Sequence, residues 1–377
     1  MTPIPLVDLQ AQHRQIAEEV KRGLADVIER ASFVLGDEVM AFEAAFASFV
    51  GVQHCVSVAN GTDALELALR AVGIGTGDEV IVPVNSFIAS ALAVVRAGAT
   101  PVFVDCDPTY HLIDTRHVGD TIGPRTKAIV PVHLYGQLAG MEELERVAQA
   151  RGVLLIEDAA QAQGARRHGT AAGGFGIAAG TSFYPGKNLG AYGDGGAVLT
   201  NADDVAKKIR ALRNYGSDVK YHHPETGFNS RLDTIQAVVL NAKLPHLAAW
   251  NEARRRAARR YDELLAPLGS VTRPATLAGN DHIWHLYVVR VPRRDEVLQR
   301  LHRAGIGAGV HYPVPMHLQG AFHHLGYKRG DFPVAERAAA EVLSLPLFPE
   351  ITPQQQLRVV EELTAALATL GPAPSTS

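Results

Sequence analysis

Short apolar runs alternate with longer amphipathic stretches through the first two thirds of the chain. The stretches between the runs place apolar residues at helical spacing, so each run and its successor predict a strand followed by a helix. Strands and helices in this order predict βαβ units, and therefore a mostly parallel sheet covered by helices on both faces. The strand-like runs occupy 54–58, 78–83, 100–105, 127–132 and 153–158, and two more lie within 181–201.

The pattern changes near residue 240, where a long, charged helical stretch begins. The elements expected after it are a helix over 244–268, a strand over 283–292, a helix over 293–305, a strand over 307–313 and a helix over 352–370. Thr352 is expected to cap the last helix, with Pro353 at its first position. We predict an α/β fold in three parts: an N-terminal helix with a large domain over 1–240, a smaller α+β domain over 241–370, and a disordered tail over 371–377.

Composition and charge narrow the function classes. The chain has 36 Lys and Arg against 39 Asp and Glu, a net charge of −3, so it has no basic surplus to attract nucleic acid. No apolar stretch approaches the roughly 18 residues that a membrane span needs, and the N-terminus lacks a secretory signal pattern. Cys55 and Cys106 each lie in an apolar run, which is typical of a reducing compartment. We expect a cytoplasmic protein that binds neither nucleic acid nor a membrane.

Two segments at predicted strand ends carry groups that could bind a ligand, because open α/β sheets bind ligands there. Between a strand and a helix, Gly61 allows a close backbone approach, and Thr62 with the free N–H groups could hold a phosphate; the alternative is an ordinary helix cap. Asp158, which ends an apolar strand, could hold a proton on a heteroaromatic nitrogen, with Gln161 beside it. Its alternatives are a helix cap or a partner for an arginine.

A third segment, 182–190, sets Lys187 among glycine, proline and apolar residues. A poorly solvated lysine loses proton affinity and becomes a nucleophile that attacks aldehydes; the alternative is a surface lysine on a hairpin. Ser182 could add a phosphate donor. Together the three segments fit pyridoxal 5′-phosphate (PLP), with Lys187 and Asp158 as the catalytic residues: Lys187 holds the cofactor and then moves a proton between carbons, and Asp158 keeps the ring nitrogen protonated.

Several segments resemble the hallmark segments of the DegT-type sugar aminotransferases, and the resemblance covers nearly the whole chain. They include NGTDALELALR, NSFIASALAV, EDAAQAQGA, SFYPGKNLGAYGDGGAVLTN and GFNSRLDTIQAVVLNAKL. The resemblance implies PLP fold type I, as in aspartate aminotransferase, and a homodimer with active sites at the subunit interface.

The resemblance also implies roles for single residues. Lys187 matches the Schiff-base lysine, Asp158 the partner of the ring nitrogen, and Gln161 the residue beside the ring hydroxyl. The remaining implied cofactor contacts are Gly61, Thr62 and Ser182 at the phosphate, Phe87 stacked on the ring, and Asn229 reaching the phosphate from the other subunit. One departure is Gln163, where many members have histidine; we expect it to affect packing behind the site more than PLP binding.

The family moves an amino group, usually from L-glutamate, onto a nucleotide-linked keto-sugar. The segments FYPGKNLGAYGDGG, NYGSDVKYHH, HIWHLYVVR and VHYPVPMHLQGAF look closest to the branch that aminates C3 of dTDP-3-keto-6-deoxyhexoses, giving dTDP-3-amino-3,6-dideoxyhexoses. The sugar contacts implied by this analogy are Tyr184, Tyr221, His311, Tyr312 and His317. The alternatives are a 4-keto or UDP-linked sugar as substrate, or a regulator that binds PLP or a sugar nucleotide without turnover.

Two other clusters invite different functions. The histidines at 311, 317, 323 and 324 suggest a metal site, but Pro313 and Pro315 prevent a helical pair of ligands and no cysteine accompanies them, so we expect no metal. The arginines within 254–260 suggest nucleic acid, but on a long helix such a run is more often a solvated face interleaved with acids.

Overall fold

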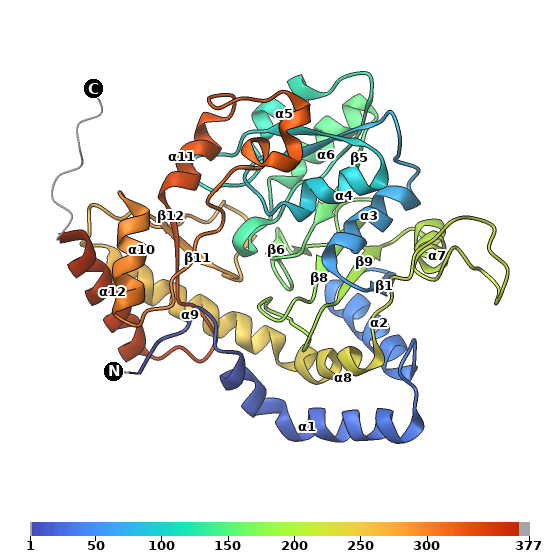
Figure 1. Ribbon diagram of the computed structural model, residues 1–377, viewed down its shortest axis with the longest axis horizontal. Helices are drawn as coiled ribbons and strands as arrows, with labels where there is room; N and C mark the ends of the chain where they lie inside the picture. The colour runs from blue at the N-terminus through green and yellow to red at the C-terminus, as the bar shows by residue number, and fades with distance from the viewer. Residues whose placement is uncertain (1, 369–377) are drawn as a thin grey trace.

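The structure, a computed structural model of the protein, describes residues 2–368. Its largest sheet has seven strands in the order β1-β9-β8-β5-β4-β2-β3 (Figure 1). Neighbouring strands are parallel from β8 to β3, whereas β9 is antiparallel to both β8 and β1. The predicted α/β class, with a mixed and mostly parallel sheet, is therefore confirmed. The strands are β1 (His54–Val58), β2 (Glu79–Pro83), β3 (Thr100–Val104), β4 (Thr126–Ile129), β5 (Leu154–Asp158), β8 (Ala178–Ser182) and β9 (Gly196–Thr200).

Helices cover both faces of this sheet, because successive side chains of a strand point to opposite faces. In β2, Val80 and Val82 pack with α3, α4 and α7, while Ile81 packs with α5 and α6 on the other face. On this second face, α2 and α8 cover β1 and β9, and α1 packs on α8. The helices are α1 (Leu9–Arg30), α2 (Asp37–Val50), α3 (Gly61–Ala71), α4 (Ala89–Ala97), α5 (Thr115–Thr121), α6 (Met141–Arg151), α7 (Asp203–Leu212) and α8 (Thr234–Lys243).

A smaller α+β part follows, with its own core. An antiparallel pair, β11 (Tyr287–Arg290) and β12 (Val342–Leu345), packs against α10 and α12 and the second half of α9. The helices are α9 (Leu247–Leu265), α10 (Arg294–Arg303), α11 (Pro333–Glu341) and α12 (Pro353–Ala368), and the remaining short strands are β6 (Arg166–Arg167), β7 (Thr170–Ala171) and β10 (Asn280–Asp281). Single 3₁₀ turns are η1 (Leu134–Gly136), η2 (Leu244–His246), η3 (Met316–Leu318) and η4 (Gly320–Leu325).

Two expected strands differ from the structure. The strand expected over 307–313 does not form; only Gly309 makes a bridge, to Ser344, and the pairing partner of β11 is β12, which the pattern did not predict. Glycine and proline leave 307–313 with few side chains to pack, whereas β12 is buried along its whole length. The second strand, expected around TSFYP, lies three residues earlier as β8 and ends at Ser182, ahead of the turn at Pro185.

The division at residue 240 stays a prediction, and three segments lie across it. Ile4 bridges Ile306 and packs in the core of the smaller part. In the other direction, Met316 and Phe322 pack in the core of the large sheet. Helix α9 joins both, since Leu247 packs with α2 and α8 while the second half of the helix packs with α12.

The last helix begins as expected. Thr352 Oγ1 accepts a hydrogen bond from the Gln355 N–H at 3.2 Å, and Gln355 Oε1 accepts one from the Thr352 N–H at 2.8 Å, a reciprocal cap. The tail predicted over 371–377 lies outside the described residues.

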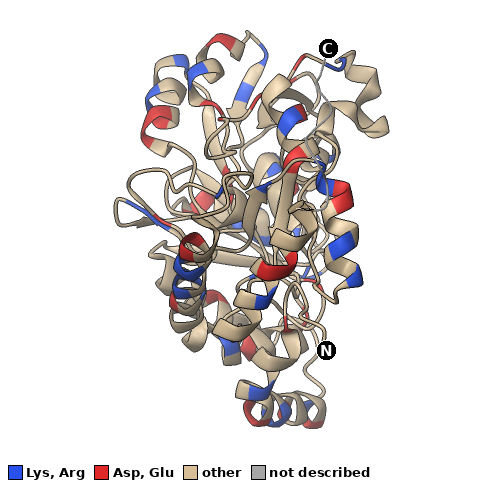
Figure 2. Cartoon of the chain, turned by 90° about the vertical axis from the view of Figure 1, so that its left-hand side faces the viewer, with Lys and Arg blue, Asp and Glu red and all other residues tan. Residues whose placement is uncertain are grey.

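Charges of both signs are interspersed over the surface (Figure 2). In α9, Glu252 pairs with Arg255 and Arg259, which fits the expected solvated face. Arg254 departs from it: the guanidinium is buried and donates to the carbonyls of Trp284, His285 and Leu347. Within residues 2–368, the helices lack an apolar stretch long enough to cross a membrane.

Candidate active site

A cavity of about 600 Å³ opens at the carboxyl ends of the parallel strands β5 and β8. It brings together residues that lie far apart in the sequence, as expected for the strand-end edge of such a sheet. The predicted site residues that line it are Gly61, Thr62, Phe87, Asp158, Gln161, Ser182, Tyr184, Lys187, His311 and Tyr312.

One end of the cavity is the first turn of α3. Asn60 caps the helix by accepting the Asp63 N–H at 2.9 Å, so the helix-cap alternative is true of Asn60. That cap leaves the N–H groups of Gly61 and Thr62 without a partner among residues 2–368, and the Ser182 hydroxyl borders the same space. A Cβ on Gly61 would lie 2.6 Å from Ser182 Cβ, so only glycine allows this approach. The arrangement suits a phosphate group.

Asp158 lies at the mouth of β5 and is 4% exposed. Its Oδ2 accepts a hydrogen bond from Ser90 Oγ at 2.7 Å, and its Oδ1 accepts the Ala160 N–H at 3.1 Å. Ser90 in turn contacts Ser86 Oγ at 2.6 Å. No arginine pairs with Asp158 within the described residues, so the carboxylate keeps acceptor capacity that faces the cavity.

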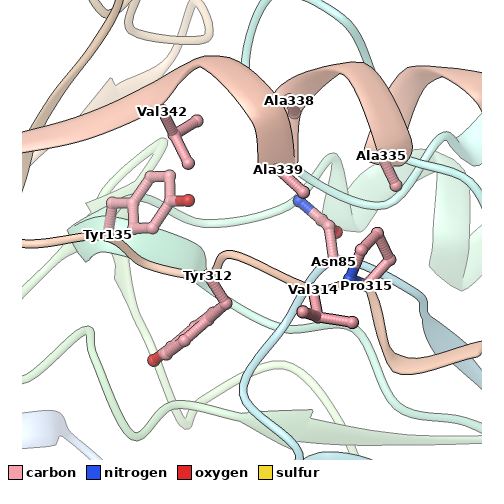
Figure 3. A pocket seen from close by; sticks show the side chains of 9 residues that line it. All are labelled: Asn85, Tyr135, Tyr312, Val314, Pro315, Ala335, Ala338, Ala339 and Val342. Carbon is pink, nitrogen blue, oxygen red and sulfur yellow. The ribbon is translucent and has the colours of Figure 1, made fainter. Parts of the chain in front are cut away.

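The opposite wall is built around Gln161 and Tyr312. Gln161 Oε1 accepts the Tyr135 N–H at 2.7 Å, and Gln161 Nε2 donates to the Tyr312 hydroxyl at 3.2 Å. The Tyr135 hydroxyl donates to the His311 carbonyl, which ties the large sheet to the segment before η3. Figure 3 shows Tyr135 and Tyr312 from this outer side, below the end of α11. The ring of Phe87 lies 5.4 Å from that of Tyr312 and is half exposed, so it offers an apolar face to the cavity.

Lys187 lies in a turn after β8, where its N–H bonds the Tyr184 carbonyl at 2.8 Å. The side chain is half-buried and lines the cavity, which excludes the surface-lysine alternative. Burial lowers the pKa of its amine to about 8, and the Asp158 carboxylate opposes this shift. The amine has no hydrogen-bond partner among the side chains and backbone that the structure describes. A larger share of it is therefore unprotonated near neutral pH than in an ordinary lysine.

Some predicted contacts lie outside the cavity. Asn229 and Tyr221 are exposed, and Tyr221 is 82% exposed. His317 is not supported as a sugar contact: it is 1% exposed, bonds Glu336 at 3.0 Å and packs on the Phe332 ring. Its apolar neighbours make it a core histidine.

Other residues at the site escaped the sequence analysis. Ser90 supports Asp158, and His285 and Asp194 line the cavity together with Leu6 and Val7 from the start of the chain. Helical spacing identifies Ser90 only as one position of a helix. Nothing local marks His285, because the strand run that contains it predicts a core residue equally well.

Two buried polar groups stand behind the site. Glu157 is fully buried and accepts hydrogen bonds from His133 Nε2 and from the N–H groups of Gly173, Phe175 and Gly176. Gln163 donates to Thr181 Oγ1 and to the Ser182 carbonyl without lining the cavity, in keeping with the expected role in packing. In the part of the chain that the structure describes, no three His, Cys, Asp or Glu side chains gather as metal ligands do.

Known proteins resemble this chain over almost its full length. The model of the DegT/DnrJ/EryC1/StrS aminotransferase family matches residues 14–364. A protein of Geobacillus stearothermophilus named pleiotropic regulatory protein is 47% identical over 96% of this chain and 97% of its own. The UDP-N-acetyl-3-dehydro-alpha-D-glucosamine 3-aminotransferase of Acidithiobacillus ferrooxidans is 47% identical, over 97% of this chain and 98% of its own.

A third relative and a crystal structure agree with them. The dTDP-3-amino-3,4,6-trideoxy-alpha-D-glucose transaminase of Streptomyces venezuelae is 46% identical over 95% of this chain and 94% of its own. The crystal structure of S. venezuelae DesV superposes with a TM-score of 0.95 at 45% identity, covering 97% of this chain and 99% of DesV.

Proposed function

The chain belongs to the DegT/DnrJ/EryC1/StrS aminotransferase family, and on this premise we propose that it moves the amino group of L-glutamate to C3 of a dTDP-linked 3-keto-6-deoxyhexose. The product would be a dTDP-3-amino-3,6-dideoxyhexose. Position 3 is supported by the names of two relatives, since both place the nitrogen or the keto group at C3 of the sugar. Those names differ in the nucleotide, so the UDP-linked sugar is the second candidate.

A single observation carries the proposal: Lys187, Asp158 and the first turn of α3 face one cavity. This donor set fits PLP. The N–H groups of Gly61 and Thr62 and the hydroxyls of Thr62 and Ser182 would hold the phosphate. Asp158 would hold the proton on the ring nitrogen, with Gln161 beside the ring hydroxyl and Phe87 against the ring face. When bound, PLP supplies a conjugated ring that can accept the electron pair of a C–H bond next to nitrogen.

The chain's own residues would then manage the proton. Lys187 Nζ, which is largely desolvated, takes a proton from the carbon that bears the amino group and delivers it one atom further along. Ser90 and the Ala160 N–H hold the Asp158 carboxylate in place, so it stays ionised opposite a positive nitrogen. Tyr184, His311 and Tyr312 border the remaining space, where the sugar would lie.

The homodimer with shared sites belongs to this proposal. Asn229 and Tyr221 are exposed and lie outside their own chain's cavity, as residues that serve a partner's site would. A mixture of Lys187→Ala and Asn229→Ala subunits, each inactive alone, should regain activity, because a mixed dimer holds one intact site. Absence of recovery in verified mixed dimers would contradict shared sites. A cytoplasmic location is proposed as well, supported by the two free, buried thiols.

The test is a substrate panel. Purified protein with PLP and L-glutamate is given dTDP-linked 3-keto and 4-keto sugars and a UDP-linked 2-acetamido-3-keto sugar, and products are identified by mass spectrometry and NMR. Amination at C3 of the dTDP sugar is the expected result, and preferred amination of the UDP sugar would select the second candidate. If no sugar is aminated and glutamate yields no 2-oxoglutarate, the chain is a regulator without turnover.

A further inference from the structure

His285 is a buried histidine that none of the roles above uses. It lies just before β11, is 8% exposed and lines the same cavity as Lys187. Its Nδ1 lies 3.2 Å from Asn188 Oδ1, and its Nε2 has no partner within residues 2–368. Because Nε2 is also absent from the sealed, unpartnered side-chain atoms of this region, it opens onto the cavity.

A chain of amide hydrogen bonds decides which nitrogen of His285 carries the proton. Asn251 Nδ2 donates to the Gln163 carbonyl at 3.0 Å, which leaves Asn251 Oδ1 as acceptor for Asn188 Nδ2 at 2.8 Å. Asn188 Nδ2 also donates to the Ile283 carbonyl at 3.2 Å, so both amides are fixed by backbone carbonyls that can only accept. Asn188 Oδ1 must therefore accept from His285 Nδ1–H. The lone pair of the neutral ring is left on Nε2.

The surroundings keep this ring neutral. Burial lowers the pKa of His285 well below its ordinary value, and the charges of Lys187 and Arg254 and the rings of His311 and His282 lower it further. Arg254 Nη1 also lies within hydrogen-bond distance of the His285 carbonyl, at 3.4 Å, which holds the backbone of this segment. His285 is therefore an acceptor and not a cation at neutral pH.

We propose that His285 is a positioning residue for Lys187: its Nε2 lone pair accepts a hydrogen bond from the Lys187 amine whenever that amine is not engaged with the cofactor. This rests on the proposed function, in which Lys187 must leave the cofactor and then carry a proton. An amine on a flexible four-carbon chain without a fixed partner samples many positions. A neutral acceptor beside it favours one position and stabilises the ammonium form once Nζ has taken the proton.

Two substitutions separate this role from packing. His285→Asn keeps a donor for Asn188 Oδ1 but has no atom at the Nε2 position, whereas His285→Gln can place an amide oxygen there and loses the anchor to Asn188. The pKa of Lys187 is measured in the full-length protein without cofactor, by competitive acetylation against pH with mass spectrometry of its peptide. We expect His285→Asn to lower this pKa by about one unit, a tenfold shift in the protonation constant, and His285→Gln to stay near wild type. His54→Asn, at a surface pair with Asp203, is the unshifted control.

The outcome in the holoenzyme supplies a second readout. His285→Asn should slow the conversion of glutamate in a single turnover while leaving the dependence on glutamate concentration unchanged, and His285→Gln should restore the rate. If His285→Asn matches wild type in the pKa of Lys187, or if His285→Gln is the more damaged of the two, His285 acts only through its anchor and the proposal is wrong.

A direct observation covers the case in which either variant fails to fold. In wild-type protein, ¹⁵N NMR of labelled histidine should show His285 as the Nδ1–H tautomer at pH 7, and an Nε2–H tautomer would overturn the proposal. Neither the labelling nor the NMR experiment involves a sugar. Failure of the substrate panel would therefore leave these results standing, and the reverse holds as well.

Discussion

Ser90 Oγ donates a 2.7 Å hydrogen bond to Asp158 Oδ2 and so joins α4 to the mouth of β5. Ser86 contacts Ser90 from the preceding turn at 2.6 Å, which extends the support by one more hydroxyl. Hydrogen bonds to a carboxylate favour its charged form. The charge proposed to hold the ring nitrogen thus depends on a helix that meets β5 only in the folded chain.

We predict a graded series at this contact. Asp158→Asn should retain part of the PLP affinity but slow the glutamate half-reaction by at least about 100-fold, because an amide cannot hold the ring proton. Ser90→Ala should slow it by about tenfold, the equivalent of about 1.4 kcal/mol, and Ser86→Ala by less. Rapid-mixing absorbance spectroscopy measures these rates. An unchanged rate in Asp158→Asn would make the carboxylate structural.

Lys187→Ala should abolish amino transfer, with a loss of at least about 10³-fold, while the protein stays folded. The side chain lines the cavity wall and packs in none of the apolar clusters, so its removal leaves no core void. The measurements are product formation and the thermal midpoint, with Lys207→Ala on the exposed face of α7 as control. Full activity in Lys187→Ala would defeat the assignment of this lysine.

Gly61→Ala should weaken PLP binding by about tenfold or more without unfolding the protein. The added Cβ would lie 2.6 Å from Ser182 Cβ and would push the two walls of the phosphate cradle apart. The dissociation constant is measured by fluorescence titration. Gly119→Ala is the matched control, since its Cβ would meet only Val147, at an ordinary 3.9 Å. Equal affinity in both variants would contradict a phosphate at α3.

Capture of PLP by Lys187 should depend on pH with a midpoint near 8. Burial lowers the pKa of the amine to about 8, and only the unprotonated amine attacks the aldehyde. The rate should therefore rise about tenfold per pH unit below 8 and level off above it. Stopped-flow absorbance of the cofactor measures the rate. A rise that continues past pH 10 would show an ordinary, solvated lysine.

Glu157→Ala should destabilise the fold by about 3–5 kcal/mol, because it leaves His133 and three buried N–H groups without their acceptor. Burial alone would raise the pKa of Glu157, but the hydrogen bonds from His133 and the backbone outweigh it and lower the pKa below 4.5. The stabilisation is therefore present above pH 4.5 and is lost as the pH falls through the lowered pKa.

Urea unfolding at several pH values tests the Glu157 prediction. Wild-type stability should fall more steeply with acid than that of Glu157→Ala, and the exposed Glu361→Gln is the control for general charge effects. Equal acid sensitivity in wild type and Glu157→Ala would show that the buried carboxylate contributes nothing to stability.

The positions of Asp158 and Lys187 could be predicted because each follows a strand that the apolar pattern identifies, and parallel strands bring their carboxyl ends to one edge. The same reasoning placed Gly61 and Thr62. It failed for His317, whose neighbours in the sequence suggest a ligand while its neighbours in space are Phe332 and Glu336. Resemblance carries no information about which histidine of a segment turns into the core.

The sequence by itself determined the alternation of strands and helices, the class of fold and the strand-end groups, because these follow from local periodicity and chain order. The tertiary structure alone decided the support of Asp158 by Ser90, the pairing of β11 with β12, and the direction of the His285 lone pair. These contacts join residues 50 to 100 positions apart, as in the 97 between Asn188 and His285. No local pattern encodes such contacts, since they depend on how whole elements pack.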